Sequence, residues 1–174
     1  DKVGYTTALT SVTTDAAGTT DLNGASVTTT GAQTYNDAVV LSANTTLTGS
    51  GITFGSTIKS TGGSNYSLGI TDSGVTTLGG AIGSATLADK VSSLTLSSTG
   101  GISLNAGSVY STSSQSYTGA VTLGGDTTLS GVGVVFHSAV DGAKTLTVND
   151  SGTTQFLDKV GYTTALTSVT TDAA

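Results

Sequence analysis

The sequence predicts an all-β fold, a right-handed parallel β-helix (β-solenoid), and three observations support this prediction. Short stretches alternate apolar with small polar residues, which is typical of strands that bury one face. Gly, Asn, Asp and Ser cluster between these stretches, where tight turns favour them. Residues 1–17, DKVGYTTALTSVTTDAA, return unchanged as residues 158–174. Self-similarity of this kind indicates a chain of stacked repeats.

A fainter repeat lies within the 157-residue period that separates these two identical segments. TTLTGSGITFGSTI at 45–58 resembles TTLSGVGVVFHSAV at 127–140. We therefore expect one solenoid segment over residues 1–174, with sub-repeats near 1–79 and 80–157 and with 158–174 starting the next repeat. Both ends are expected to belong to the interior of a longer array, since they have the same amino-acid sequence.

Each sub-repeat divides into pieces that begin with a Thr-Thr-like step and contain three apolar stretches. The pieces start at Thr19, Thr45, Thr76, Ser103, Thr127 and Thr153. Their spacing predicts coils of about 26 residues with three short strands each, and about six to seven coils in the chain. One buried column would then hold Leu22, Leu47, Leu78, Leu104, Leu129 and Phe156.

The composition excludes several classes of function. Charged residues make up only 9% of the chain, and the net charge is −6. Nucleic-acid binding needs a dense Lys/Arg surface, so no nucleic-acid partner is expected. No apolar run is long enough for a transmembrane helix, so direct membrane insertion is not expected. The chain contains no Cys, so disulfides cannot hold it together.

The repeated phrases resemble a known family. GAQTYNDAVVLSANTTLTGSGITFGSTI at 31–58 returns in altered form as SSQSYTGAVTLGGDTTLSGVGVVFHSAV at 113–140. These stretches resemble the repeat regions of filamentous-haemagglutinin-like adhesins, which are large secreted surface proteins of Gram-negative bacteria. The resemblance covers nearly the whole chain and lies in composition and recurring phrases. It implies a parallel β-helix shaft, an extracellular location on the bacterial cell surface, and a role in adhesion or biofilm.

Two features are candidate surface contacts. Gln33 and Tyr35 recur as Gln115 and Tyr117, and exposed tyrosines at regular intervals could stack on sugar rings of host or cell-surface glycans. Packing of each tyrosine over a corner of the solenoid is the competing interpretation. The segment KSTGGSNYS at 59–67 is longer than its counterpart DGAKT at 141–145, and variable loops on a constant scaffold often carry recognition.

Catalytic, metal and cofactor sites are not expected. The Asp residues stand at strand ends among Gly, Ser and Thr, where their side chains favour turn hydrogen bonds. His137 is the single histidine and should point outward after the inward Phe136, without a catalytic partner. The glycine pairs lack the Lys and the following helix of a phosphate-binding loop. We expect neither an enzyme nor a bound cofactor.

Rows of threonine of the kind that bind ice are not expected either. Thr46-Leu47-Thr48 and Thr145-Leu146-Thr147 have the appropriate alternation, but they are assigned to different strands and are not expected to recur in each coil.

The sequence therefore predicts a structural shaft segment of a large secreted adhesin or extracellular fibre, with neighbouring repeats as its partners. One alternative is a filament subunit that stacks end to end with identical chains, because exposed strand edges favour further pairing. A lesser alternative is a solenoid that binds or processes glycans.

Overall fold

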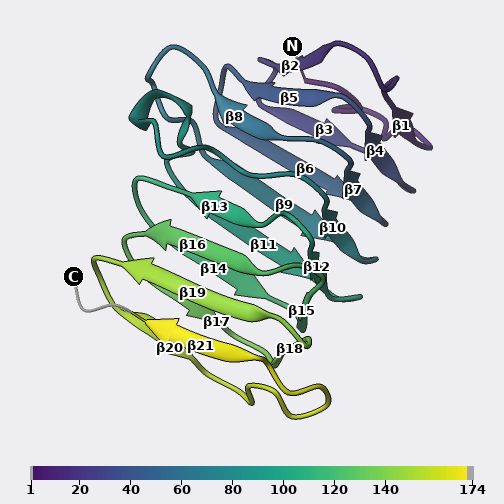
Figure 1. Cartoon of the computed structure of the whole chain (residues 1–174). Coiled ribbons are helices and arrows are strands. Elements are labelled where there is room, and N and C mark those ends of the chain that lie inside the picture. Colours follow the sequence, from purple (N-terminus) through teal and green to yellow (C-terminus); the bar gives the residue numbers. More distant parts are fainter. Residues whose placement is uncertain (1, 172–174) are drawn as a thin grey trace.

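The computed structural model describes residues 2–171, which form a parallel β-solenoid of about 8 turns of roughly 20 residues each. Residue 1 and residues 172–174, which belong to the two copies of the repeated segment, lie outside the described residues. In Figure 1 the first turns lie at the top and the last turns at the bottom, with the strands of successive turns side by side. The predicted all-β parallel solenoid is therefore confirmed.

Three stacks of parallel strands run along the solenoid, and we number them sheets 1, 2 and 3. Sheet 1 has seven strands, in the spatial order β1 (Val12–Thr13), β4 (Gln33–Tyr35), β7 (Ile52–Phe54), β10 (Thr76–Leu78), β12 (Ile102–Leu104), β15 (Val121–Leu123) and β18 (Val140–Asp141). Because each strand pairs only with the turn before and the turn after it, the hydrogen-bond ladder runs along the axis of the stack.

Sheet 2 is built from two parts. The first part is β2 (Thr19–Leu22), β5 (Ala38–Leu41) and β8 (Ile58–Ser60), and the second is β13 (Ser108–Tyr110), β16 (Thr127–Gly131), β19 (Thr145–Asp150) and β21 (Ser168–Thr171). Single bridges from Ile58 to Ile82 and from Ile82 to Val109 connect the two parts. Sheet 2 is therefore continuous, although it is narrowed to one residue at Ile82.

Sheet 3 has seven strands, which are β3 (Ser26–Thr28), β6 (Thr45–Gly49), β9 (Leu68–Asp72), β11 (Leu94–Ser98), β14 (Gln115–Thr118), β17 (Val134–Phe136) and β20 (Thr154–Phe156). The chain visits the sheets in a fixed order, because β4, β5 and β6 lie in sheets 1, 2 and 3 and β7, β8 and β9 repeat that sequence. A short 3₁₀ helix, η1 (Leu87–Asp89), interrupts the order between β10 and β11.

The predicted coil length, and with it the prediction of six to seven coils, is wrong. Tyr35 pairs with Phe54 and Leu104 pairs with Leu123, so most turns take only roughly 20 residues. The Thr-Thr-like steps caused the error, since most of them recur at every fourth strand, as in β2, β6 and β10. Counting between these steps therefore measured more than one turn.

The predicted buried column is correct only in part. Leu78 does pair with Leu104, as expected. Leu47, however, lies beside Val27 and Ile70 rather than beside Leu22 or Leu78. The inward direction of these leucines was predicted correctly, because it depends on the alternation within one strand and not on the length of the turn.

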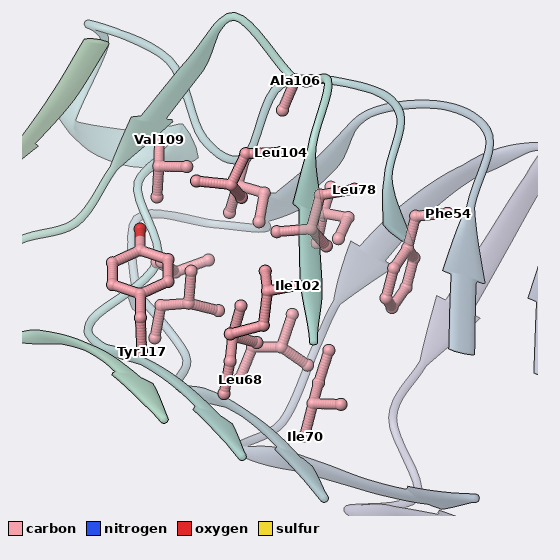
Figure 2. Close-up of a cluster of buried hydrophobic side chains, with 14 of the residues drawn as sticks. Phe54, Leu68, Ile70, Leu78, Ile102, Leu104, Ala106, Val109 and Tyr117 are labelled. Carbon is pink, nitrogen blue, oxygen red and sulfur yellow. The ribbon is translucent and has the colours of Figure 1, made fainter. Parts of the chain in front are cut away.

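The interior holds one continuous cluster of aliphatic and aromatic side chains. Figure 2 shows Leu68 and Ile70 pointing from one wall toward Leu78 and Leu104 on the opposite side. Alternation makes this possible, since β9 buries every second residue and turns the others outward. The core therefore runs from turn to turn without a break in the middle of the chain.

Small residues at the corners let neighbouring turns approach closely. A side chain on Gly74 would place its Cβ 2.6 Å from the backbone nitrogen of Gly51 in the previous turn. A Cβ on Gly100 would lie 2.5 Å from the backbone carbon of Gly74. Glycine is therefore required at this corner, because a larger residue would separate the paired strands.

Candidate functional site

The four candidate contact residues lie inside the solenoid. Gln33 and Tyr35 belong to β4 and are 0% and 1% exposed, and Gln115 and Tyr117 belong to β14 and are each 0% exposed. A sugar ring cannot reach a side chain that solvent does not reach. The expectation of exposed tyrosines on the surface is therefore wrong. The competing interpretation, packing over a corner, is correct in assigning the tyrosines a packing role, but they lie within the core.

At the first corner, Gln33 and Tyr35 form a closed set of hydrogen bonds. The Tyr35 hydroxyl donates to Oε1 of Gln33 at 2.8 Å. Nε2 of Gln33 donates to the carbonyl oxygen of Thr48 at 2.8 Å and to Oγ1 of Thr29 at 3.2 Å. Burial raises the pKa of Tyr35 above its ordinary value, so the hydroxyl keeps its proton and remains a donor.

The second corner repeats this arrangement. The Tyr117 hydroxyl donates to Oε1 of Gln115 at 2.8 Å, and Nε2 of Gln115 donates to the carbonyl oxygen of Ser130 at 3.0 Å. Oγ of Ser111, in the place of Thr29, receives a bond from the same Nε2 at 3.1 Å. Burial also raises the pKa of Tyr117. The recurrence of Gln and Tyr in the sequence therefore reflects a structural corner.

Each buried tyrosine stacks on an aromatic ring of the next turn. The ring centres of Tyr35 and Phe54 lie 5.1 Å apart, and those of Tyr117 and Phe136 lie 5.0 Å apart. In the second case the stack continues from Phe136 to Phe156 at 5.1 Å. The nearly constant spacing of these aromatic residues along the sequence was the signal that could have revealed both the turn length and the burial of the tyrosines.

Two buried carboxylates hold the corners between turns. Oδ1 of Asp72 accepts the backbone N–H of Gly51 at 2.7 Å, and Oδ2 accepts the N–H of Ile52 at 2.8 Å and the hydroxyl of Thr76 at 2.9 Å. Gly51 and Ile52 belong to the preceding turn. The carboxylate therefore links neighbouring turns in the way that a further backbone hydrogen bond would.

Asp150 has the same role near the other end. Its oxygens accept backbone N–H groups from Gly133 at 2.6 Å, Gly152 at 2.8 Å and Val134 at 3.0 Å, and the hydroxyl of Thr154 at 3.0 Å. Burial alone would raise the pKa of Asp150, but these hydrogen bonds to the charged form outweigh it and lower the pKa. The carboxylate is ionised and fully engaged, as the turn interpretation of the Asp residues predicted.

Asp37 is a third engaged carboxylate, in the turn after β4. It is 6% exposed and accepts the hydroxyl of Thr14 at 2.6 Å and that of Thr20 at 2.9 Å. The Thr14 hydrogen bond is the main cause that lowers the pKa of Asp37.

Within residues 2–171, no three or more His, Cys, Asp or Glu side chains gather where they could hold a metal ion. His137 is exposed, as its position after the buried Phe136 predicted.

A pair of loops interrupts the regular outline of the solenoid between β8 and β11. Residues 61–67 and 83–93, which we call the lateral loops, lengthen the two middle turns and project to the side in Figure 1. Nδ2 of Asn65 joins them by donating to the carbonyl oxygens of Leu87 and Lys90, each at 2.7 Å. The longer segment noted at 59–67 is therefore one half of a two-loop projection.

A shallow groove of about 390 Å³ lies beside the second lateral loop. It is lined by Leu87, Lys90, Ser111, Thr112, Ser130, Gly131, Val132, Asn149, Asp150 and Ser151. The lining combines hydroxyl, amide and backbone groups with apolar surface, to which Leu87 and Val132 belong. The groove can offer hydrogen bonds to an extended polar ligand, but its only carboxylate already binds the amides described above.

The outer face of sheet 3 carries rows of hydroxyl groups in register. One row consists of Thr28, Thr48, Thr71, Ser97 and Thr118, which are paired from turn to turn. The neighbouring row holds Ser26, Thr46, Gly69, Thr95 and Ser116. Single hydroxyls therefore recur, but among these five turns only Thr46-Leu47-Thr48 has threonine in both rows, so the expectation that the motif would not recur in each turn is confirmed. Thr145 and Thr147 do lie elsewhere, in sheet 2.

Comparisons with known proteins identify no relative: no family model, no curated protein and no solved structure matches the chain. The resemblance to adhesin repeats therefore stays a prediction. In the part of the chain that the structure describes, no helix is long and apolar enough to cross a membrane.

Proposed function

We propose that this chain is a shaft segment of a large secreted surface adhesin or extracellular fibre, with a mechanical and not a catalytic role. The observation that carries the proposal is the unbroken core. Buried residues of each turn contact those of the next, and backbone hydrogen bonds connect all turns along the axis. A pull along the axis would load many parallel hydrogen bonds at once, which suits a rod that transmits force.

We further propose that the solenoid winds to the right with three strands in each turn. The repeated visit to sheets 1, 2 and 3 supports three strands. A right-handed path is supported by the strong preference for right-handed connections between parallel strands.

The proposed location is extracellular, on a bacterial cell surface, and the proposed partners are neighbouring repeats of the same protein. The outer faces support this proposal because they are rich in Ser and Thr, and the charge is low and negative. Such a surface attracts neither nucleic acid nor anionic lipid.

Removal of one complete repeat from the parent protein tests the proposal. At roughly 4.8 Å per turn, the projection should shorten by about 35 Å in electron micrographs, and binding by the rest of the protein should persist. Loss of binding without a change in length would contradict a purely mechanical role. A matched control removes the same number of residues from outside the repeat.

Self-assembly of separate chains into a filament is the alternative. Sheet edges at both ends of the stack favour it, because unpaired strands can accept more strands. Electron microscopy of the isolated chain decides between the two. A shaft segment should give single rods of about 38 Å, from eight turns at roughly 4.8 Å, and a filament subunit should give long fibres.

Glycan binding is a second candidate, and the hydroxyl rows of sheet 3 favour it. Their spacing of roughly 4.8 Å between turns offers regular hydrogen bonds to an extended polymer. Replacement of Thr48 and Thr71 by Val keeps the shape and removes the hydroxyls. Reduced retention on polysaccharide columns would support this function, and unchanged retention would exclude this face.

A further inference from the structure

The two Gln–Tyr corners have the same contacts but lie in different sheets. Gln33 and Tyr35 belong to β4 in sheet 1, and Gln115 and Tyr117 belong to β14 in sheet 3. The sub-repeat therefore does not contain a whole number of turns. Equivalent residues return with the same neighbours but face another direction around the axis.

The perfect repeat shows the same shift without any change in sequence. Val12 and Thr13 pair with β4 in sheet 1, whereas the identical Val169 and Thr170 pair with β19 in sheet 2. Val3 bridges to Val27 of β3 in sheet 3. Its identical counterpart, Val160, bridges to Val140 of β18 in sheet 1.

The register gives the size of the shift. Starting from Val3, the partners along sheet 3 are Val27, Leu47, Ile70, Leu96, Tyr117, Phe136 and Phe156. These seven steps end shortly before Val160, which is the next paired position of the chain and lies in sheet 1. One full repeat thus spans seven turns and one further strand position.

Local structure is preserved despite the shift. Gly4 and Gly161 have φ values of 69° and 68°. Nζ of Lys2 lies 4.2 Å from the ring centre of Tyr5, and Nζ of Lys159 lies 3.9 Å from that of Tyr162. The two tyrosines are 71% and 72% exposed. We call residues 2–9 and 159–166 the Lys–Tyr loops.

A third, diverged copy of this loop is the second lateral loop. Gly83 has a φ of 67°, and Ile82 before it bridges within sheet 2. Val3, Ile82 and Val160, which occupy equivalent places before their glycines, therefore lie in sheets 3, 2 and 1. The same kind of loop leaves the solenoid from each of the three sheets.

We propose that, in a tandem array of this repeat, each copy is rotated by one third of a turn relative to the copy before it. The Lys–Tyr loop then faces three directions in succession and returns to the first direction after every third copy. At roughly 4.8 Å per turn, successive loops lie about 35 Å apart along the axis, and loops on one side lie about 105 Å apart. This inference rests on the proposed shaft function for its biological meaning.

The consequence concerns contact with partners. A shaft whose repeats were in phase would place all Lys–Tyr loops along one side and could bind a flat surface through each of them. A rotated shaft presents the loops around its whole circumference, and a flat partner meets only one loop in three. Lateral contacts between parallel shafts are then available on each of the three sides.

Paired cysteines test the rotation in the chain itself, which contains no native Cys. Thr147 and Thr170 are cross-strand partners in sheet 2 and both point away from the core. Parallel neighbours lie close enough for a disulfide. The variant Thr147→Cys/Thr170→Cys should therefore form an internal disulfide in most molecules under mild oxidation.

The matched control pairs Thr170 with the residue that it would lie beside if the repeat were in phase with the turns. Thr13, its counterpart, lies beside Thr34 in the outward row of sheet 1 that ends at Asp141. Asp141→Cys/Thr170→Cys should remain reduced, and Thr13→Cys/Thr34→Cys should form its disulfide as a positive control. The proposed rotation would be overturned if the Asp141/Thr170 pair formed a disulfide, or if neither of the two pairs that contain Thr170 did. Neither result would affect the shaft proposal, which depends on the length of the projection.

Discussion

The two Gln–Tyr corners provide the most informative comparison within this molecule. Both bury their side chains and close the same hydrogen bonds, with a Thr hydroxyl at the first corner and a Ser hydroxyl at the second. They differ in the sheet that carries them and in the aromatic stack, which ends at Phe54 in the first corner and continues to Phe156 in the second. Corner chemistry therefore depends on the neighbouring turn and not on the face of the solenoid.

The comparison explains how a sequence repeat can contain a number of solenoid turns that is not whole. Each turn offers its neighbour the same edge of backbone groups, whichever sheet is considered. A segment that encodes a corner needs only a neighbouring turn of suitable shape. Selection for a repeat length equal to a whole number of turns is then unnecessary.

The largest expected effect is a charge in the core, introduced at equivalent positions of the two sub-repeats. Leu47 and Leu129 are each 0% exposed. Leu47→Asp and Leu129→Asp should each lower the free energy of unfolding by more than about 4 kcal/mol, because each leaves an unpaired carboxylate among aliphatic side chains. Chemical denaturation followed by circular dichroism measures the loss.

Val132→Asp is the control for these variants, since Val132 is 47% exposed. It should change the free energy of unfolding by no more than about 0.5 kcal/mol. An equally mild effect at Leu129 would show that the inward assignment is incorrect.

A smaller effect is expected when the corner hydroxyls are removed. Tyr35→Phe and Tyr117→Phe each leave Oε1 of a buried glutamine without its donor, and each should cost about 1–3 kcal/mol of unfolding free energy. The two losses should be similar, because both hydroxyl bonds are 2.8 Å long. Tyr5→Phe, at a tyrosine that is 71% exposed, should have almost no effect. A loss at only one corner would end the claim that the corners are equivalent.

The pH dependence of stability should reveal the contribution of the buried carboxylates that link neighbouring turns. The pKa of Asp150 is lowered in the folded chain, so its contribution is complete above its ordinary pKa of 3.8 and is lost as the pH falls through the lower folded value. Asp150→Asn should reduce the slope of stability against pH below about 4. Urea denaturation between pH 2 and pH 6 measures this slope, and an unchanged slope would contradict the assignment.

The smallest effect is expected at the lateral loops, which the regular turns do not require. Asn65→Gly removes the two hydrogen bonds to the second loop and retains the backbone at φ 49°, so it should cost less than about 1 kcal/mol. Asn65→Ala should cost slightly more, since alanine is strained at this φ. Hydrogen exchange should accelerate in residues 84–90 and not in β6 or β16. Faster exchange in those strands would mean that the loops support the core.

Several features of the fold were predictable from the sequence because they depend on local patterns. Alternation within single strands gave the inward direction of Leu47 and Leu129, and turn residues marked the strand ends. The length of a turn was not obtained, because the most visible markers, the Thr-Thr steps, recur at every fourth strand in most cases. The spacing from Tyr35 to Phe54, which pair in neighbouring turns, held the correct answer.

The candidate site was predicted less well, for a different physical reason. Gln33 is polar, and polar residues are usually exposed. Its burial depends on acceptors that other turns supply, such as the carbonyl oxygen of Thr48. A single sequence does not reveal such partners until the register is known. The role of the Asp residues was predictable only in part. Asp150 accepts the N–H of Gly152 two residues later, as an Asp in a turn is expected to do, but its hydrogen bonds to Gly133 and Val134 of the preceding turn depend on the register.

The central claim, a continuous stack of turns of roughly 20 residues, is tested most directly by aromatic NOE spectroscopy of the intact chain. The chain contains 6 Tyr and 3 Phe, so its aromatic spectrum is sparse enough to assign. Ring-to-ring contacts should appear between Tyr35 and Phe54, between Tyr117 and Phe136, and between Phe136 and Phe156. Absence of these contacts, or contacts from Tyr35 to residues one predicted coil length later in place of Phe54, would contradict the register on which the account depends.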